Sequence, residues 1–177
     1  MNPRAAQSPF AAPFLFGARS RRAFTLVEVM VVVTIVSVLA AFAMPTFKRI
    51  ATSARATATA NDLRVFAAAF QSYGQQTANY PPSAGIGVLP PLMADALKRT
   101  AWQRVTPIRG HYKWNLNTVH AGTRYRASIS LRTQGTNRVS NDQSQLLAID
   151  RAIDDGNLAT GVFLIGAGNE PAYIVER

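Results

Sequence analysis

The sequence contains no cysteine, and this absence removes several chemistries at once. It excludes disulfide bonds, a thiol nucleophile, cysteine-ligated zinc and a lipoprotein anchor, because each of these needs a cysteine side chain. Acidic residues are also few: 9 Asp and Glu stand against 19 Lys and Arg, which leaves a formal net charge of +10. This excess suits an anionic partner such as nucleic acid or lipid headgroups. Part of it lies before residue 23, where Arg4, Arg19, Arg21 and Arg22 occur without any acid.

The common enzyme signatures are missing as well. Gly166-Ala167-Gly168 begins a dinucleotide-binding pattern, but Pro171 stands where its third glycine belongs. Gly156 and Gly161 have the spacing of a phosphate-binding loop without its lysine. His111 and His120 are isolated from other metal-binding residues, and no Gly-x-Ser-x-Gly occurs. The sequence therefore predicts no enzyme, no catalytic residue and no cofactor.

Aspartates near the C-terminal end are the remaining candidate metal ligands, namely Asp142, Asp150, Asp154 and Asp155. Calcium binds carboxylate oxygens, but the spacing of these residues matches no twelve-residue calcium loop. A solvated helix end accounts equally well for Asp154 and Asp155. We therefore predict no metal site.

One long uncharged run is present. With 48% hydrophobic residues among 177, the chain has enough apolar surface for one ordinary domain and a tail. Glu28 is the only charged residue in the range 23–44, and the range 29–47 carries no charge. Because about 20 apolar residues in a helix cross a bilayer core, the sequence predicts one transmembrane helix. The arginines before it favour a cytoplasmic N-terminus, although basic residues also follow it in the range 48–55.

Three interpretations of this N-terminus are open on local sequence. A secretory signal peptide would use Ala41-Phe42-Ala43 as its small-x-small cleavage site before Met44. A twin-arginine export signal matches Ser20-Arg21-Arg22-Ala23-Phe24. The third interpretation depends on Glu28, because a carboxylate costs about 2.5–3.5 kcal/mol at the bilayer centre and by default marks a functional site with a partner. Neither export signal uses that carboxylate.

The run Arg21-Arg22-Ala23-Phe24-Thr25-Leu26-Val27-Glu28 favours the third interpretation, because it resembles the class III leader of type IV pilins and type II secretion pseudopilins. The resemblance implies that a prepilin peptidase cuts between Ala23 and Phe24 and that the new amino group of Phe24 is N-methylated. It also places Glu28 at the family's glutamate position and Pro45 where the family helix is kinked. The family usually has glycine before the cut, whereas this sequence has Ala23.

Cleavage at this position creates an ammonium group on Phe24, with a reference pKa of about 7.7–8.0, at the cytoplasmic end of a membrane helix. A charge in a medium of low dielectric constant needs a counter-charge. Glu28 lies one turn further along the same helix, so we expect it to face the Phe24 ammonium of a neighbouring subunit and to set the register of assembly. The alternative is that Glu28 extends toward the lipid headgroups.

Helical periodicity continues past Pro45, and Gly74 is the expected stop. The apolar residues that recur at steps of three and four are Phe47, Ala51, Ala54, Ala58, Leu63, Phe66, Phe70 and Tyr73. Alternating patterns predict strands over 112–117 and 124–132 and a final strand pair over 162–165 and 173–175. Short helices are expected after Pro90 and over 145–155.

These elements predict an α+β, pilin-like fold, in which a long, kinked N-terminal helix packs on a small antiparallel sheet. The expected segments are a cleaved basic leader at 1–23, a transmembrane half of the helix at 24–47, an amphipathic half at 48–74 and a globular head at 75–177.

The expected function is that of a structural, pilin-like subunit of a type II secretion or type IV pilus-like fibre. The resemblance implies processing by a prepilin peptidase and N-methyltransferase, a single pass through the bacterial inner membrane with a periplasmic head, and assembly with copies of itself or other pilin-like subunits by an inner-membrane platform. Adhesive pilins commonly carry a cysteine pair near the end of the chain, so its absence favours a secretion pseudopilin.

Two alternatives remain: an exported soluble protein, and a DNA-uptake minor pilin. The second would grip phosphates through Arg124, Arg126, Arg132 and Arg138. No aromatic residue interleaves these arginines on their face, since Tyr125 alternates to the other side. Nucleic acid is therefore not an expected partner.

Overall fold

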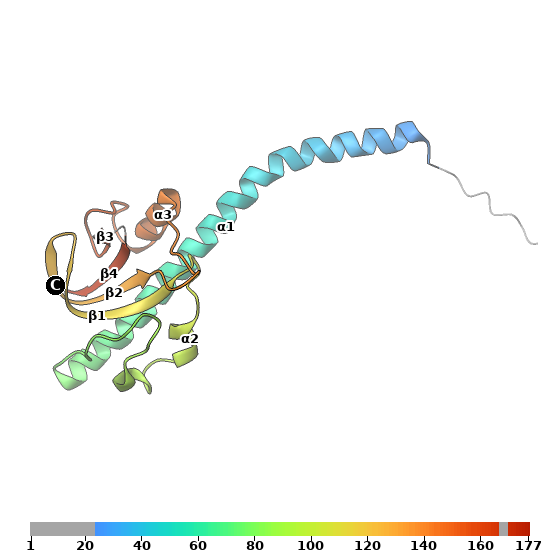
Figure 1. Cartoon of the computed structure of the whole chain (residues 1–177). Coiled ribbons are helices and arrows are strands. Elements are labelled where there is room, and N and C mark those ends of the chain that lie inside the picture. The colour runs from blue at the N-terminus through green and yellow to red at the C-terminus, as the bar shows by residue number, and fades with distance from the viewer. Residues whose placement is uncertain (1–23, 167–169) are drawn as a thin grey trace, which may run out of the picture. The chain divides into compact units, whose positions relative to one another are not determined.

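The computed structural model of the chain describes residues 24–166 and 170–177 (Figure 1). The chain divides into two compact units, Met1–Phe42 and Ala43–Arg177, and helix α1 (Leu26–Thr77) begins in the first and ends in the second. Among the described residues, the first unit holds only the start of α1, whereas the second holds all other helices and strands.

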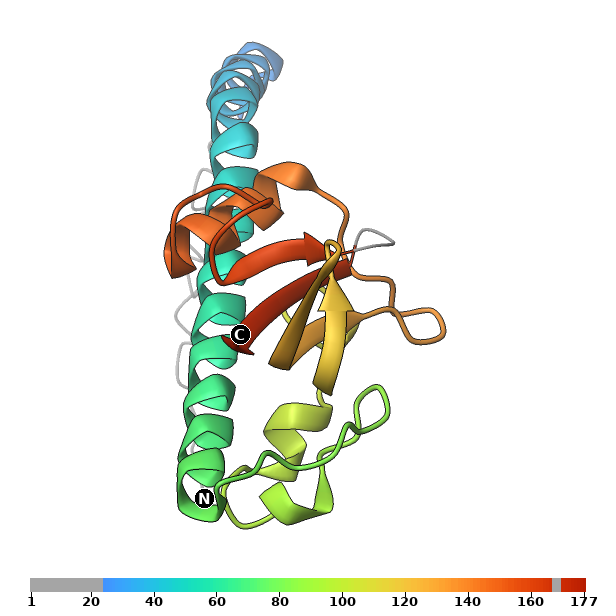
Figure 2. The same cartoon turned by 90° about the vertical axis from the view of Figure 1, so that its left-hand side faces the viewer.

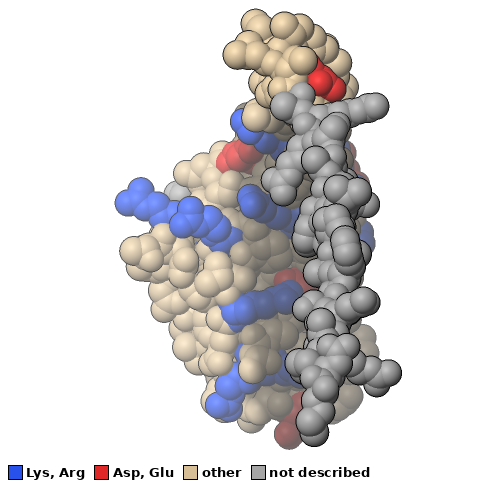
Figure 3. All heavy atoms as spheres, turned by 90° about the vertical axis from the view of Figure 1, so that its right-hand side faces the viewer, with Lys and Arg blue, Asp and Glu red and all other residues tan. Residues whose placement is uncertain are grey.

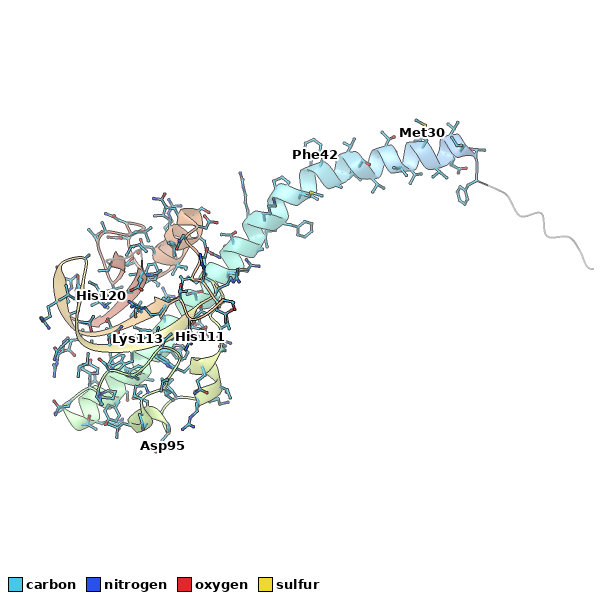
Figure 4. The ribbon with its side chains drawn as sticks, viewed as in Figure 1. Met30, Phe42, Asp95, His111, Lys113 and His120 are labelled. Atoms are coloured by element: carbon cyan, nitrogen blue, oxygen red, sulfur yellow. The ribbon has the colours of Figure 1, made fainter. Side chains whose placement is uncertain are left out.

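The first unit's part of α1 is apolar and uncovered. Every side chain from Phe24 to Phe42 is exposed, and Met30 and Phe42 project outward from the helix (Figure 4). A helix satisfies its backbone hydrogen bonds internally, which a lipid environment demands even of a segment rich in valine and isoleucine. By length and composition, α1 is the one helix in the described part of the chain that could cross a membrane.

In the second unit, α1 buries one face against the head. The buried residues are Ala56, Thr59, Ala60, Leu63, Phe66, Ala67 and Phe70. The later half of the predicted apolar stripe, from Leu63 to Phe70, is therefore confirmed. These side chains belong to the same core cluster as the inner face of the sheet.

The earlier half of the predicted stripe is wrong. Phe47 has 70% of its surface exposed, and Ala51, Ala54 and Ala58 are exposed as well. The buried face begins instead at Ala56. In an alanine-rich helix, apolar residues occur on more than one face, so periodicity does not reveal which face the head covers.

Helix α1 also ends later than predicted. Gly74 lies inside the helix, which continues to Thr77 and is followed by Ala78 in the left-handed conformation, with a φ of 58°. The glycine serves close packing instead of termination, because a Cβ at position 74 would lie 2.9 Å from the Tyr80 ring. Predicting a stop from glycine alone therefore placed the end about one turn too early.

The head contains a four-stranded antiparallel sheet in the order β1-β2-β4-β3. Its strands are β1 (His111–His120), β2 (Thr123–Arg132), β3 (Phe163–Gly166) and β4 (Glu170–Glu176). All four predicted strands are thus confirmed. The sheet lies against the second half of α1 (Figure 2).

The remaining helices are short. Helix α3 (Gln143–Ile153) confirms the helix predicted over 145–155 and lies beside α1 (Figure 2). The single helix expected after Pro90 is instead a 3-10 turn, η1 (Pro91–Met93), and a separate helix α2 (Arg99–Gln103). Lys98 has an extended backbone, with ψ at 115°, and this separates α2 from the preceding turns.

Aromatic side chains join α1 to the sheet. The rings of Phe70 and Trp114 are stacked with their centroids 3.8 Å apart. Phe66 meets Trp102 and Tyr112 edge to face, with centroid distances of 5.1 and 4.9 Å. Each such pair adds about 0.5–1.5 kcal/mol to what burial alone contributes, so this cluster holds the head on α1.

The sheet has a second, smaller core separate from the one that contacts α1. It consists of Leu164, Ala172 and Ile174, with Tyr125 packed against them. We predicted that Tyr125 would share a face with Ala127 and the apolar residues after it, and this is wrong. Ala127, Ile129 and Leu131 belong to the core that contacts α1, whereas Tyr125 contacts the second core.

Candidate functional site

Phe24 and Glu28 lie at the start of α1. Phe24 is 77% exposed and precedes the helix, and Glu28 is exposed in its first turn. The Glu28 amide donates to the Thr25 hydroxyl at 3.2 Å, and the Val29 amide donates to the Thr25 carbonyl at 3.2 Å. Thr25 is therefore the N-cap of α1. We did not predict this role, although Thr-x-x-Glu is the pattern of a capping box.

Ala23 and Pro45 are the other two predicted site positions. Ala23, on the leader side of the expected cut, lies outside the described residues. Pro45 lies within α1, whose helical assignment continues on both sides of it. A kink at Pro45 therefore stays a prediction.

Glu28 has no ion pair with any residue in the ranges 24–166 and 170–177. The ion pairs of these residues lie in the second unit, where they join Asp62 to Arg104, Arg126 to Glu176 and Arg132 to Glu170. A carboxylate in an apolar membrane segment is costly without a partner. Its position one turn from the expected new amino terminus makes Glu28 the candidate functional group of this unit.

Within the head, Asp62 ties α1 to two other segments. Its carboxylate accepts hydrogen bonds from Arg104 Nη2 at 2.6 and 2.5 Å and from the Tyr112 hydroxyl at 2.8 Å. The Asp62 side chain is only 13% exposed. Burial, and then the charge of Asp62, raise the pKa of Tyr112 far above its ordinary value, so its hydroxyl remains a donor.

Replacing Asp62 with alanine should lower the free energy of unfolding by about 1–3 kcal/mol, mainly because the buried Tyr112 hydroxyl loses its acceptor. The half-exposed Arg104 contributes less, since solvent screens its charge. Urea unfolding of the full chain in detergent, followed by the fluorescence of the two buried tryptophans, measures the change. Asp95→Ala, at an exposed acid, is the control and should cost less than about 0.5 kcal/mol. An equally small effect of Asp62→Ala would contradict its anchoring role.

The two histidines are the first and last residues of β1 and lie apart from each other (Figure 4). His120 Nε2 is 2.8 Å from Ser128 Oγ, and both residues are buried. Burial, and then the charges of Arg132 and Lys113, lower the pKa of His120, so its ring stays neutral. A serine enclosed in this way is not presented to a substrate. The contact satisfies buried polar groups on the second face of the sheet.

Two of the arginines proposed for phosphate binding already have acidic partners. Arg126 Nη1 lies 2.6 Å from Glu176 Oε1. Arg132 forms an ion pair with Glu170. A cation that already has a partner gains less from a phosphate, because the existing pair must first be broken.

The other two arginines have no acidic partner among the described residues. Arg124 donates to a backbone carbonyl at 3.0 Å, and Arg138 is exposed in the loop after β2. On the face drawn in Figure 3, basic side chains occur in separate groups with uncharged surface between them.

The candidate aspartates are divided between the two ends of α3. Asp142 is the N-cap, and its carboxylate accepts from the Ser144 amide at 2.9 Å and the Ser144 hydroxyl at 2.7 Å. These hydrogen bonds lower the pKa of Asp142. Asp150, Asp154 and Asp155 gather at the other end, where one oxygen of each lies within 4.8 Å of the others. Asp154 and Asp155 are exposed, as a helix end predicts, but Asp150 is fully buried.

Comparison with known proteins identifies the N-terminal segment. Residues 18–44 match the family model described as the prokaryotic N-terminal methylation motif. No match was found among curated proteins or among solved structures. The matched motif is the leader signature of type IV pilins and pseudopilins, which confirms the resemblance drawn from the sequence.

The long N-terminal helix packed on a small antiparallel sheet is a pilin-like arrangement, in keeping with the leader motif. The motif implies processing by a prepilin peptidase and assembly with pilin subunits. With its apolar N-terminal helix, the chain fits a single-pass inner-membrane pilin. This class is structural and not enzymatic.

Proposed function

We propose that the chain is a structural subunit of a type II secretion pseudopilus, or of a related type IV pilus-like fibre. The chain is cut between Ala23 and Phe24, N-methylated on Phe24 and assembled from the inner membrane by a platform at that membrane. The observation that carries this proposal is Glu28, an exposed carboxylate in the first turn of an apolar helix and inside the methylation motif. The absence of cysteine supports the secretion pseudopilus over an adhesive pilus.

The start of α1 supports the proposed role of Glu28. Thr25 caps the helix, so that Phe24 extends just beyond its first turn. Cleavage then places an ammonium group on Phe24, beside a helix end that already carries partial positive charge. The Glu28 carboxylate of one subunit neutralises the Phe24 ammonium of the next, because an unpaired charge in this apolar setting costs several kcal/mol. This pairing sets the axial register between subunits.

The remaining segments serve this assembly. We propose that residues 1–23 are the cleaved leader, 24–47 the transmembrane half of the helix, 48–77 its second half, which packs on the sheet, and 78–177 the rest of the periplasmic head. Pro45 has no amide hydrogen for the helical bond to position 41 and so bends the helix close to the membrane surface. Nucleic acid is not among the proposed partners, since Arg126 and Arg132 already have acidic partners and Arg124 donates to a backbone carbonyl.

The position of the mature amino terminus tests this proposal. Mass spectrometry of the purified mature chain should find N-methylated Phe24 as its first residue. Ala23→Trp should accumulate as the uncut precursor in the membrane, because the peptidase needs a small residue before the cut. Ala23→Gly is the matched control and should be cut normally, since it supplies the residue that this leader class usually has. A mature chain that begins at Met44 and is soluble in the periplasm would contradict the proposal.

A further inference from the structure

Asp150 is the most unusual ionisable group of the head. It lies in the last turn of α3, none of its surface is exposed, and its ionised carboxylate would have no hydrogen-bond donor among the side chains of residues 24–166 and 170–177. Burying an ionised carboxylate without a partner is so costly that such a group takes up a proton or acquires a counter-charge. The surroundings of Asp150 show which of the two applies.

The nearest charged groups are two further carboxylates on the loop that leads from α3 to β3. Asp154 accepts hydrogen bonds from the amides of Val162, of Phe163 at 3.2 Å and of Asp155 at 2.8 Å. Burial opposes ionisation of Asp154, but the contact with Asp150 and these amides together lower its pKa. Asp154 is therefore the ionised member of the pair. Asp155 is held separately, by the Asn157 amide at 2.9 Å and the Thr160 hydroxyl at 2.7 Å.

The helices and strand that pack around these carboxylates supply no cation to them. From α1, Arg64 directs its guanidinium to the carbonyl of Ala152 instead of to an acid. From β4, Tyr173 contributes a neutral phenol whose pKa is raised, chiefly by burial. On α3 itself, the side chain of Arg151 lies against Gly156. No ion pair in residues 24–166 and 170–177 includes Asp150, Asp154 or Asp155.

We propose that Asp150 carries a proton that it shares with the ionised Asp154, and that this proton is a pH-sensitive lock on the junction between α3 and β3. The proton makes the pair singly charged, as in other carboxyl pairs that share one site. Burial, and then the neighbouring Asp154 and Asp155, raise the pKa of Asp150 to about 7. The lock is therefore closed in acid and opens near neutrality.

Asp154 transmits the protonation state of Asp150 to the sheet. Its carboxylate holds the amides of Val162 and Phe163, and the Phe163 side chain is fully buried in the core. Gly161 permits this approach, because it has a φ of 82° and a Cβ there would collide with the Asp154 carboxylate. When Asp150 ionises, repulsion between the two carboxylates is relieved by moving Asp154 away from these amides. The hydrogen bonds that join the start of β3 to the end of α3 are then lost.

The direction in which pH changes stability follows from the pKa values of Asp150 in the unfolded chain and in the folded head. In the unfolded chain Asp150 loses its proton near its ordinary pKa, whereas in the folded head it keeps the proton up to about pH 7. Between these values the folded state binds one more proton, so stability falls as pH rises. The unfolding equilibrium constant should increase by up to about tenfold per pH unit in this range. The effect is independent of Glu28 and holds whether or not the subunit assembles.

Urea unfolding of the full chain in detergent and EGTA, followed by tryptophan fluorescence, tests the lock between about pH 5 and about pH 8. The wild type should become less stable across this range relative to Asp150→Asn, which mimics the protonated acid but cannot ionise. The variant should be the more stable of the two throughout, and its advantage should widen from the acid end and level off above about pH 7. Asp95→Asn, at an exposed acid, is the matched control and should keep the wild-type pH profile. Parallel profiles for wild type and Asp150→Asn would overturn the proposal.

Two further measurements keep the test decisive if Asp150→Asn does not fold. Hydrogen exchange in the wild type, corrected for its intrinsic pH dependence, should show that the Val162 and Phe163 amides lose protection as pH rises through about 7 while the Trp114 amide does not. Unchanged protection would overturn the lock. Millimolar CaCl2 in place of EGTA should leave unchanged the urea concentration at which half of the wild type is unfolded at about pH 8. A rise in that concentration would show that a cation, and not a proton, neutralises Asp150.

Discussion

The Glu28→Leu subunit should enter the membrane and lose its leader like the wild type, yet should fail to assemble. Insertion needs apolar length, which leucine extends, and the peptidase reads the leader and the small residue before the cut. Assembly is different, because each new subunit brings a Phe24 ammonium into the apolar interior of the fibre. Breaking a buried ion pair by removing one partner costs roughly 3–5 kcal/mol. Because every added subunit carries this cost, the fibre should not grow.

Shearing or crosslinking of fibres, combined with membrane fractionation and mass spectrometry of the amino terminus, measures assembly and processing in the same cells. Ser37→Leu is the matched control, because it also replaces a polar side chain of α1 by leucine. The Ser37 hydroxyl donates within its own helix to the Val33 carbonyl at 2.7 Å, so its loss should leave assembly intact. Normal assembly of Glu28→Leu, cleaved and present at wild-type level, would show that the intersubunit pairing is wrong.

Trp114→Ala should unfold a large part of the head population. Trp114 is fully buried, its ring stacks on Phe70 at 3.8 Å, and its Nε1 donates to the Pro81 carbonyl at 2.8 Å. Truncating a buried tryptophan to alanine costs about 3–5 kcal/mol, out of roughly 5–15 kcal/mol for a whole domain. The loss falls on the contact between α1 and the sheet, so the head should also separate from its helix.

Urea unfolding followed by circular dichroism, with limited proteolysis of the head, measures this change without depending on the removed tryptophan. Leu92→Ala, at a leucine with more than half of its surface exposed, is the control and should change stability by less than about 0.5 kcal/mol. The mature amino terminus of Trp114→Ala should still be Phe24, because processing precedes any role of the head. Wild-type resistance to urea and protease would contradict the assigned role of the aromatic cluster.

Local patterns were enough to predict most of the elements. The leader motif, the apolar segment after it and the alternation in β1 and β2 each depend on residues close together in the sequence, and the corresponding features are present. The capping role of Thr25 was equally local and was within reach of the same method, since Thr-x-x-Glu marks a helix start. Element boundaries were less certain, as the continuation of α1 to Thr77 shows.

The candidate groups of the head depended on contacts across the chain. The sequence grouped Asp150 with the other candidate metal ligands and did not distinguish it from the exposed Asp154 and Asp155, but packing against the core removes it from solvent and brings it against Asp154. In the same way, the partners of Arg126 and Arg132 are acids at or near the end of the chain, far from them in sequence. A pattern that places the arginines on one strand contains no information about which acids pair with them.

The sequence by itself determined that this protein has a methylation leader, one apolar segment with a single carboxylate and an α+β head, because each of these follows from composition or short-range periodicity. Tertiary structure alone decided which face of α1 is buried, where Tyr125 packs and which aspartate is removed from solvent. Several faces of an alanine-rich helix are equally apolar, and a two-residue pattern does not show which core an individual strand residue contacts. The burial of a charge likewise depends on neighbours that lie far away in the sequence.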